Sequence, residues 1–161
     1  SYFGDDGAAV SGWRDDGAKR YYLSPSTLKS VRYEQDIDGK RYYFDNDYSM
    51  VTGWVTWNND KTRSYFGDDG AALEGWQTVD GKRYYFDPAN EFHGARYERT
   101  IDGKFYYFDS DCSMWTGWLT WNVDGSRSYF GDDGAAVSGE VYISGVRYLF
   151  GNDFKLIMTL Y

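Results

Sequence analysis

A short aromatic block recurs along the whole chain at nearly constant spacing, and this periodicity limits the folds that the sequence can adopt. The last residue of successive blocks recurs every 20 to 22 residues. These last residues are Phe3, Leu23, Phe44, Phe66, Phe86, Phe108, Phe130 and Phe150. A fixed short period is typical of stacked repeat proteins, in which each unit contacts mainly its neighbours. The 161 residues therefore divide into about eight units, the first of them incomplete.

A longer period overlies the short one. The segment SYFGDDGAA begins at Ser1, Ser64 and Ser128, which are steps of 63 and 64 residues, so three short units make one larger unit. We expect residues 1–161 to be a single repeat array. Because Ser1 falls inside a repeat, we also expect the array to be the C-terminal fragment of a larger protein, with any targeting segment elsewhere.

Within a unit, the pattern is that of a β-hairpin. Asp80-Gly81 stands between two strand-like runs, and Asp-Gly is favoured in a type I′ turn because both central residues need positive φ. Asp60-Lys61 lacks the glycine, which predicts a looser loop there. The same Asp-Gly pair recurs at Asp38-Gly39, Asp102-Gly103 and Asp124-Gly125. No stretch has a helical period long enough to compete with strands, and the segment from Ser26 to Lys29 is expected to be irregular, so the predicted fold class is all-β.

Aromatic rings are expected to form the core. The chain has 17 Tyr, 7 Trp and 10 Phe, and each ring buries roughly 150–250 Å². Side chains alternate across a strand, so Tyr42 and Phe44 should share one face while Arg41 and Tyr43 share the other. Two units have Ser in place of the first Tyr of the block and an additional Trp on the preceding strand. For these pairs, Trp57 with Ser64 and Trp121 with Ser128, we expect the indole to fill the volume that a phenol leaves.

Composition excludes several classes of function. The net charge of −8 argues against binding to nucleic acid or to an anionic membrane surface. A single cysteine, Cys112, excludes an internal disulfide framework and a cysteine metal cluster. No apolar run approaches the length of a membrane span, so membrane insertion is not expected. Neither a cofactor nor a metal is expected.

The acidic residues are interpreted as turn residues. Adjacent carboxylates such as Asp68-Asp69 could suggest a glycosidase dyad, but such a pair occurs once in each larger unit, whereas an enzyme needs one dyad. Calcium binding by residues 45–49 or 109–113 stays open, although neither loop has the Glu that an EF-hand requires. His93, the only histidine, is expected in an irregular loop with a surface or packing role.

The repeats resemble the cell-wall-binding repeat family, also called choline-binding or glucan-binding repeats, of Gram-positive surface proteins, autolysins, glucan-synthesising enzymes and clostridial toxins. The matching motifs are Gly-Trp at 12–13, 53–54, 75–76 and 117–118, and DGKRYYFD at 38–45 and 80–87. The resemblance covers essentially the whole chain. It implies a solenoid of stacked β-hairpins with about three hairpins per turn, which fits the longer period. It also implies a non-catalytic module that anchors a larger secreted protein to a cell-wall surface.

The resemblance suggests where a ligand would bind. In the choline-binding branch, a cage between successive hairpins combines the Gly-Trp indole, a loop Met and two further aromatics, and holds the ligand by cation–π attraction. Here the first of those further aromatics is replaced by Arg in six of seven units, with Phe105 as the exception. An indole beside a guanidinium suits a sugar better than a cation. An alternative role for the Arg side chains is to neutralise the acidic loops.

We therefore predict a carbohydrate-binding module with several weak aromatic sites. The candidate ligand-binding residues are Trp13, Trp54, Trp76, Trp118, Tyr97, Phe105, Met50, Met114, Arg83 and Tyr85. Among these, Tyr97, Phe105, Met114 and Trp118 are expected to form the junction best suited to choline. The expected partner is a cell-wall polysaccharide, a glucan or a choline-bearing teichoic acid.

Two other functions remain open: a module specific for choline or choline-bearing teichoic acid, and a structural spacer or self-association scaffold. No enzyme activity is expected in this segment. Residues 141–161 lack Gly-Trp and end in an aliphatic run, which predicts a capping repeat; this segment could also support a homodimer. The expected location is the cell-wall surface of a Gram-positive bacterium.

Overall fold

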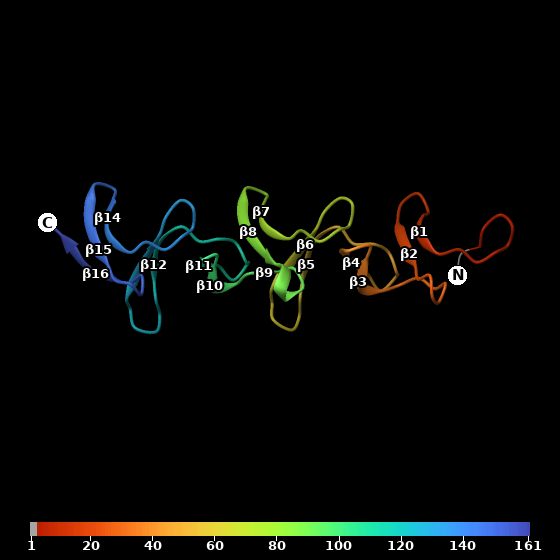
Figure 1. The fold of residues 1–161 in the computed structure, drawn as a ribbon, viewed down its shortest axis with the longest axis horizontal. Coiled ribbons are helices and arrows are strands. Elements are labelled where there is room, and N and C mark those ends of the chain that lie inside the picture. The colour runs from red at the N-terminus through yellow and green to blue at the C-terminus, as the bar shows by residue number, and fades with distance from the viewer. Residues whose placement is uncertain (1–2) are drawn as a thin grey trace. The chain divides into compact units, whose positions relative to one another are not determined.

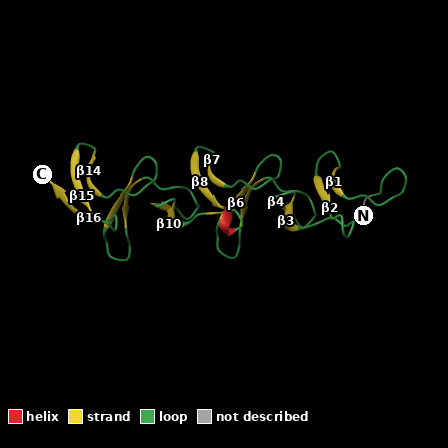
Figure 2. Ribbon diagram, in the orientation of Figure 1, coloured by secondary structure: helices red, strands yellow, loops and turns green. Residues whose placement is uncertain are grey.

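The computed structural model describes residues 3–161, which form repeated antiparallel hairpins and confirm the all-β fold class (Figure 1). Strands and loops account for the described chain except for one short 3-10 helix, Pro88–Asn90 (Figure 2). Ser1 and Tyr2, which begin the first SYFGDDGAA segment, lie outside the described residues. In the described part of the chain, no helix is long and apolar enough to cross a membrane.

The chain divides into two compact units, residues 1–74 and 75–161. In the first unit the strands are β1 (Gly12–Asp15), β2 (Arg20–Leu23), β3 (Tyr33–Ile37), β4 (Lys40–Phe44), β5 (Gly53–Thr56) and β6 (Arg63–Phe66). They pair in sequence order as three two-stranded sheets, β1-β2, β3-β4 and β5-β6. Each sheet is therefore a local hairpin.

The second unit has four hairpins, two of which gain a third strand. Its strands are β7 (Gly75–Val79), β8 (Lys82–Asp87), β9 (His93–Gly94), β10 (Tyr97–Ile101), β11 (Lys104–Phe108), β12 (Gly117–Thr120), β13 (Arg127–Phe130), β14 (Gly139–Ile143), β15 (Val146–Phe150) and β16 (Leu156–Leu160). The hairpins are β7-β8, β10-β11, β12-β13 and β14-β15; β9 adds to β8, and β16 adds to β15.

The hairpin turns follow the sequence at most positions. Asp80 and Gly81 have φ of 50° and 76°, as a type I′ turn requires, and the Asp38-Gly39 and Asp102-Gly103 turns are alike. The prediction for Asp124-Gly125 is wrong, because only the glycine has positive φ and a longer loop, residues 121–126, connects β12 to β13. There the Asp124 carboxylate instead accepts hydrogen bonds from the backbone and hydroxyl of Ser126.

The core contains the side chains that close seven of the eight aromatic blocks, while Phe3, which closes the first, is 64% exposed. The seven core residues are at most 2% exposed: Leu23, Phe44, Phe66, Phe86, Phe108, Phe130 and Phe150. The predicted alternation is confirmed, since Tyr42 and Phe44 are buried while Arg41 and Tyr43 are partly exposed. Burial of a Phe side chain stabilises the folded state by about 1.5–3 kcal/mol, so a short hairpin gains much of its stability from one ring.

Backbone hydrogen bonds connect each hairpin to the segment that follows the next one. In the first unit, the Met50 amide donates to the Arg20 carbonyl at 2.7 Å. In the second unit, the Met114 amide donates to the Arg83 carbonyl at 2.8 Å, and the Ala136 amide donates to the Phe105 carbonyl at the same distance. These bonds join consecutive hairpins that share no sheet.

Ion pairs connect the same elements through side chains. In four hairpins, the Lys at the start of the returning strand pairs with an Asp in the loop that follows the next hairpin. These pairs are Lys19 with Asp47, Lys40 with Asp69, Lys82 with Asp111, and Lys104 with Asp133. The last junction reverses the arrangement, because Asp124 stands on the hairpin and Lys155 in the following loop. The charges are exchanged but the pair is kept.

The two Trp–Ser exchanges have a more specific basis than volume. The indole Nε1 of Trp57 donates a hydrogen bond to Ser64 Oγ at 2.8 Å, and Trp121 donates to Ser128 Oγ at the same distance. Both Ser side chains are buried. Each Ser hydroxyl therefore accepts the hydrogen bond that a partly buried indole N–H needs, and the indole ring occupies the space of the missing Tyr ring.

Candidate functional site

The Gly-Trp indoles are half-buried platforms, each covered in part by a guanidinium from the same hairpin. Trp and Arg lie diagonally across the two strands on one face, because Trp76 is opposite Tyr85 and Arg83 is two residues before Tyr85. The guanidinium carbons lie 4.0–4.8 Å from the indole centroids, within the range of cation–π attraction. The four pairs are Trp13–Arg20, Trp54–Arg63, Trp76–Arg83 and Trp118–Arg127.

In the second unit, three other predicted ligand-binding residues, Arg83, Tyr85 and Met114, gather around Trp76. Tyr85 lies 5.2 Å from the indole, and the Arg83 guanidinium is above it at 4.8 Å. Trp76, Tyr85 and Met114 pack on the buried cluster that contains Phe108. The other side of the indole contacts Tyr106 at 4.9 Å. One side of Trp76 is therefore core, and the Arg83 side faces outward.

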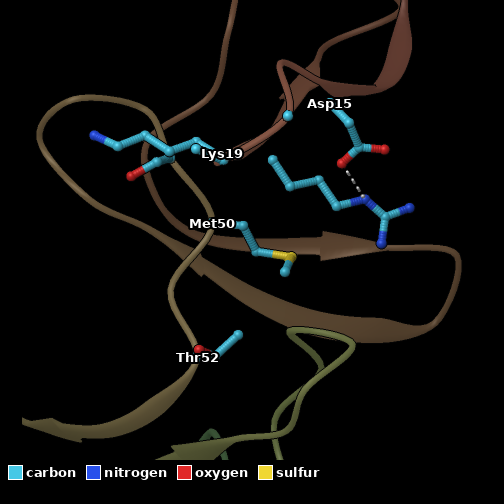
Figure 3. A pocket seen from close by; sticks show the side chains of 8 residues that line it. Asp15, Lys19, Met50 and Thr52 are labelled. Atoms are coloured by element: carbon cyan, nitrogen blue, oxygen red, sulfur yellow. Dashed lines mark ion pairs between the residues drawn. The ribbon is translucent and has the colours of Figure 1, made fainter.

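The first unit has a copy of this arrangement around Trp13, 63 residues earlier. Trp13, Tyr22 and Met50 pack on the cluster that contains Phe44, and Arg20 is 4.5 Å above the indole. Beside them is a hollow of about 510 Å³ (Figure 3). Its lining combines charged, polar and apolar residues, namely Asp15, Gly17, Ala18, Lys19, Arg20, Ser49, Met50 and Thr52.

Figure 3 shows Met50 in the middle of this hollow, with Asp15 and Lys19 on one side and Thr52 on the other. The Arg20 guanidinium pairs with Asp15 at 3.5 Å. Carboxylate, ammonium and guanidinium groups therefore lie near the partly buried indole of Trp13. Hydroxyl-rich ligands are bound by this combination of a ring face with nearby donors and acceptors.

Sequence reasoning missed the polar lining of this hollow, namely Asp15, Lys19, Ser49 and Thr52. A signal was present, because most of the lining recurs at the steps of the longer period in the second unit. The counterparts of Lys19, Arg20, Ser49, Met50 and Thr52 are Lys82, Arg83, Ser113, Met114 and Thr116.

The predicted choline junction of Tyr97, Phe105, Met114 and Trp118 is distributed over several places. Phe105 lies with Trp121, Phe130 and Phe154, at ring distances of 6.4, 6.2 and 5.3 Å. Met114 belongs to the Trp76 cluster. The remaining two contact other rings: Trp118 contacts Tyr129, Tyr148 and Phe150, and Tyr97 contacts Tyr107 and the Arg96 guanidinium. Adjacent repeats in the sequence thus contribute to different clusters.

Where Gly-Trp is absent, a glutamate occupies the position of the indole. Glu34 pairs with Arg41 at 3.5 Å, and Glu140 pairs with Arg147 at 3.7 Å. The Arg position thus faces either an indole or a carboxylate on its own hairpin. Among the hairpins within residues 3–161, only β10-β11 differs, since Glu98 there lies diagonally from Phe105.

Carboxylates of the acidic loops accept hydrogen bonds from groups of the same chain. Asp47 accepts hydrogen bonds from Lys19 and from the hydroxyl and backbone of Ser49, and these bonds hold the pKa of Asp47 well below its usual range. Asp111 has equivalent partners in Ser113 and Lys82. His93, expected in an irregular loop, is buried in β9 opposite Asp87.

Repeated hairpins with partly buried, guanidinium-covered indoles define a repeat protein built on aromatic clusters. The sequence model described as a choline-binding repeat matches residues 31–74 and 98–140, together more than half of the chain. A second model, of a cell wall binding repeat, matches residues 74–88. The chain belongs to the choline-binding repeat family, whose members are binding modules.

Solved structures agree with this assignment. Choline binding protein F from Streptococcus pneumoniae, crystallised in the presence of a peptidoglycan analogue, matches with 26% identity and a TM-score of 0.85. The match covers 96% of this chain and 54% of that protein. CbpJ from Streptococcus pneumoniae TIGR4 has the same fold, with 24% identity, a TM-score of 0.86, and coverage of 96% and 55%. The chain thus spans about half the length of these structures. A search of the curated proteins found no match.

Proposed function

We propose that this module binds a cell-wall glycan through its Trp–Arg platforms and thereby holds a larger protein at the surface of a Gram-positive bacterium. The observation that carries the proposal is the recurrence of one arrangement, indole, guanidinium, Tyr and Met, around Trp13 and around Trp76. A sugar ring would lie on the exposed indole edge and accept hydrogen bonds from the guanidinium. Binding requires no catalysis, and we propose none for this segment.

Several such platforms on one array would act together. Once one platform is engaged, the next binds at a high effective concentration, which raises apparent affinity by ~10²–10⁴. Purified cell wall and a soluble glucan are suitable ligands for a test. We expect Arg83→Ala to weaken binding by less than about tenfold, and the combined Ala substitution of Arg20, Arg63, Arg83 and Arg127 to weaken it by about 100-fold or more.

The matched control is Arg147→Ala. Arg147 has the same position in its hairpin but pairs with Glu140 instead of an indole. Its substitution should leave binding unchanged. If Arg147→Ala weakened binding as much as Arg83→Ala, then net charge, and not the indole platform, would account for recognition.

The second candidate is choline or choline-bearing teichoic acid. The Trp76 cluster favours it, because an indole, a Tyr and a Met that pack together suit a quaternary ammonium group. Millimolar choline that releases the protein from cell walls would support this function. Release by soluble glucan, with no effect of choline, would support the glycan function. Correct folding without binding to either ligand would leave the spacer or scaffold function.

We also propose that residues 141–161 form a terminal repeat and that β16 pairs with its counterpart in a second copy. β16 is the edge strand of the β14-β15-β16 sheet, and Ile157 and Met158 on it are about half exposed. An edge strand pairs readily with a second copy of itself. Sedimentation velocity should show a dimer that Met158→Lys dissociates; a monomer at high concentration would reject the dimer.

A further inference from the structure

The hairpin β10-β11 departs from a rule that the other hairpins follow. In six of the seven described hairpins, the position equivalent to Phe105 is an Arg whose guanidinium faces an indole or a Glu on the same hairpin. At β10-β11 the Glu is kept, as Glu98, but the Arg is replaced by Phe105. A carboxylate is therefore present without the guanidinium that its counterparts have.

The clearest comparison is with β3-β4, which precedes β10-β11 by 64 residues. There the Arg41 side chain is only 17% exposed and pairs with both Glu34 and Asp36. At β10-β11, Thr100 replaces Asp36 and Phe105 replaces Arg41, so one acid and its base are exchanged together for uncharged residues. Glu98 alone retains its charge.

A hollow of about 280 Å³ lies at this position. Its lining combines rings, acids and one base: Glu98, Phe105, Trp121, Val123, Asp124, Asp153 and Lys155. Lys155 is already paired with Asp124, so the charges of Glu98 and Asp153 leave the hollow with a net formal charge of −2. The hydrogen bond to Asp124 raises the pKa of Lys155, and the charges of Asp153 and Glu98 raise it further, against the opposing effect of burial.

The lining also determines which ligand chemistry fits. The Trp121 Nε1 hydrogen is already donated to Ser128, so this indole offers its ring and no donor. Phe105 is stacked on Phe154, which fixes the ring in place. The hollow thus offers carboxylate acceptors and aromatic surface. An organic cation that carries N–H donors on an apolar stem complements both.

We propose that the hollow at β10-β11 binds a primary ammonium group on an alkyl chain, such as the side chain of a lysine in a peptide. The ammonium replaces the missing guanidinium and donates to Glu98 and Asp153, while the alkyl stem lies against Phe105 and Trp121. The site is independent of the glycan platforms, because it includes none of the Trp–Arg pairs.

Two-dimensional NMR of the whole chain tests the proposal with three probes of similar size. Nα-acetyl-lysinamide should shift the Trp121 indole signal and saturate. The neutral Nα-acetyl-norleucinamide and choline, which has no N–H donor, should bind at least about fivefold more weakly. Equal binding of lysinamide and norleucinamide would overturn the charge argument, and binding of choline equal to that of lysinamide would overturn the ligand class.

Phe105→Arg is the decisive variant, because it restores the residue that the other hairpins have at this position. The new guanidinium should pair with Glu98 and reduce lysinamide binding by about tenfold or more. Unchanged binding would overturn the proposal. Trp76 and Trp118 indole signals report whether the variant stays folded. Glu98→Gln, at an exposed position, should weaken binding by about fivefold without affecting the fold.

Arg41→Phe provides the matched gain-of-function test. It reproduces the β10-β11 combination of Glu and Phe at β3-β4, next to Trp57, and should create a second lysinamide site that shifts the Trp57 indole signal. Glycan binding by the Arg20 and Arg83 platforms should not change in any of these variants. A parent chain that bound lysinamide but no glycan would reject the proposed glycan function and leave this site standing.

Discussion

At the scale of single residues, the Trp side chains have two roles that composition does not separate. Trp76 and its equivalents are partly buried under a guanidinium, whereas Trp57 and Trp121 donate hydrogen bonds to buried Ser hydroxyls. The hydrogen bonds of the second group support the fold, and the ring of Trp121 also lines the hollow at β10-β11. A Trp in this family is therefore a candidate for ligand contact only where the face beside it stays open.

The hydrogen bond from Trp121 to Ser128 should add to the free energy of unfolding beyond the contribution of indole packing. Ser128→Ala leaves the indole N–H without its partner and should lower the free energy of unfolding by about 1–3 kcal/mol. Urea denaturation monitored by Trp fluorescence measures the effect. Ser138→Ala, at an exposed position, is the control and should stay within about 0.5 kcal/mol of the parent. Equal effects of the two substitutions would show that the hydrogen bond contributes little.

At the scale of elements, the loops hold consecutive hairpins together through close packing. Met114, in the loop after β11, packs directly against Gly134, in the loop after β13: a Cβ on Gly134 would lie within 2.8 Å of three atoms of the Met114 side chain. Met50 and Gly70 have the same relation in the first unit. These Met side chains therefore serve packing as well as the aromatic clusters.

Gly134→Ala should destabilise the second unit for two reasons, a positive φ of 81° and the clash with Met114. The expected loss is about 1–3 kcal/mol. Gly125→Ala is the control, because its φ of 71° is similar and no atom lies within 4 Å of the added Cβ. The difference between their thermal midpoints isolates the contact with Met114. If the two variants melted together, backbone strain would be the whole effect.

At the scale of the whole molecule, the Lys–Asp pairs connect hairpins throughout each unit and should make stability depend on pH. Burial tends to raise the pKa of Asp111, but hydrogen bonds from Ser113 and Lys82 outweigh it and lower the pKa to about 2. Lys19 and Lys155 likewise lower the pKa of Asp47 and Asp124.

Because the folded-state pKa of Asp111 lies below its ordinary value of 3.8, its stabilising effect is complete above about pH 4 and is lost as the pH falls toward 2. We expect the thermal midpoint to fall over this range. Lys82→Met should reduce the dependence by removing one partner. A midpoint that stayed constant between pH 5 and 2.5 would contradict the prediction, as would a dependence identical in Lys82→Met.

Much of the fold could be predicted from the sequence because its signals are local. The Asp80-Gly81 turn, the alternation of Tyr42 and Phe44, and the loose loop at Lys61 depend on residues close together in the chain. Asp124-Gly125 was the exception. Asp124 and Gly125 lie close to Trp121 in the sequence. The longer loop is stabilised by the hydrogen bond from Trp121 to Ser128 and by the hydrogen bond from the Ser126 amide to Asp124.

The candidate site was less predictable, because its residues come from different hairpins. The sequence identified Trp76, Arg83, Tyr85 and Met114 individually, and the structure brings them together. The same reasoning joined Phe105 to Met114 and Trp118, which lie in other clusters. The order of repeats in the sequence does not specify which hairpin faces a given ring.

The repeat period, the hairpins and the aromatic core were thus determined by the sequence alone, since turn chemistry and strand alternation operate within about twenty residues. Only the tertiary structure decided how the functional positions are filled. It shows that Arg side chains cover the Gly-Trp indoles and that Glu98 faces Phe105 instead of a guanidinium. The physical reason is that a binding surface is made from side chains across strands and loops, and their contacts depend on how separate hairpins pack.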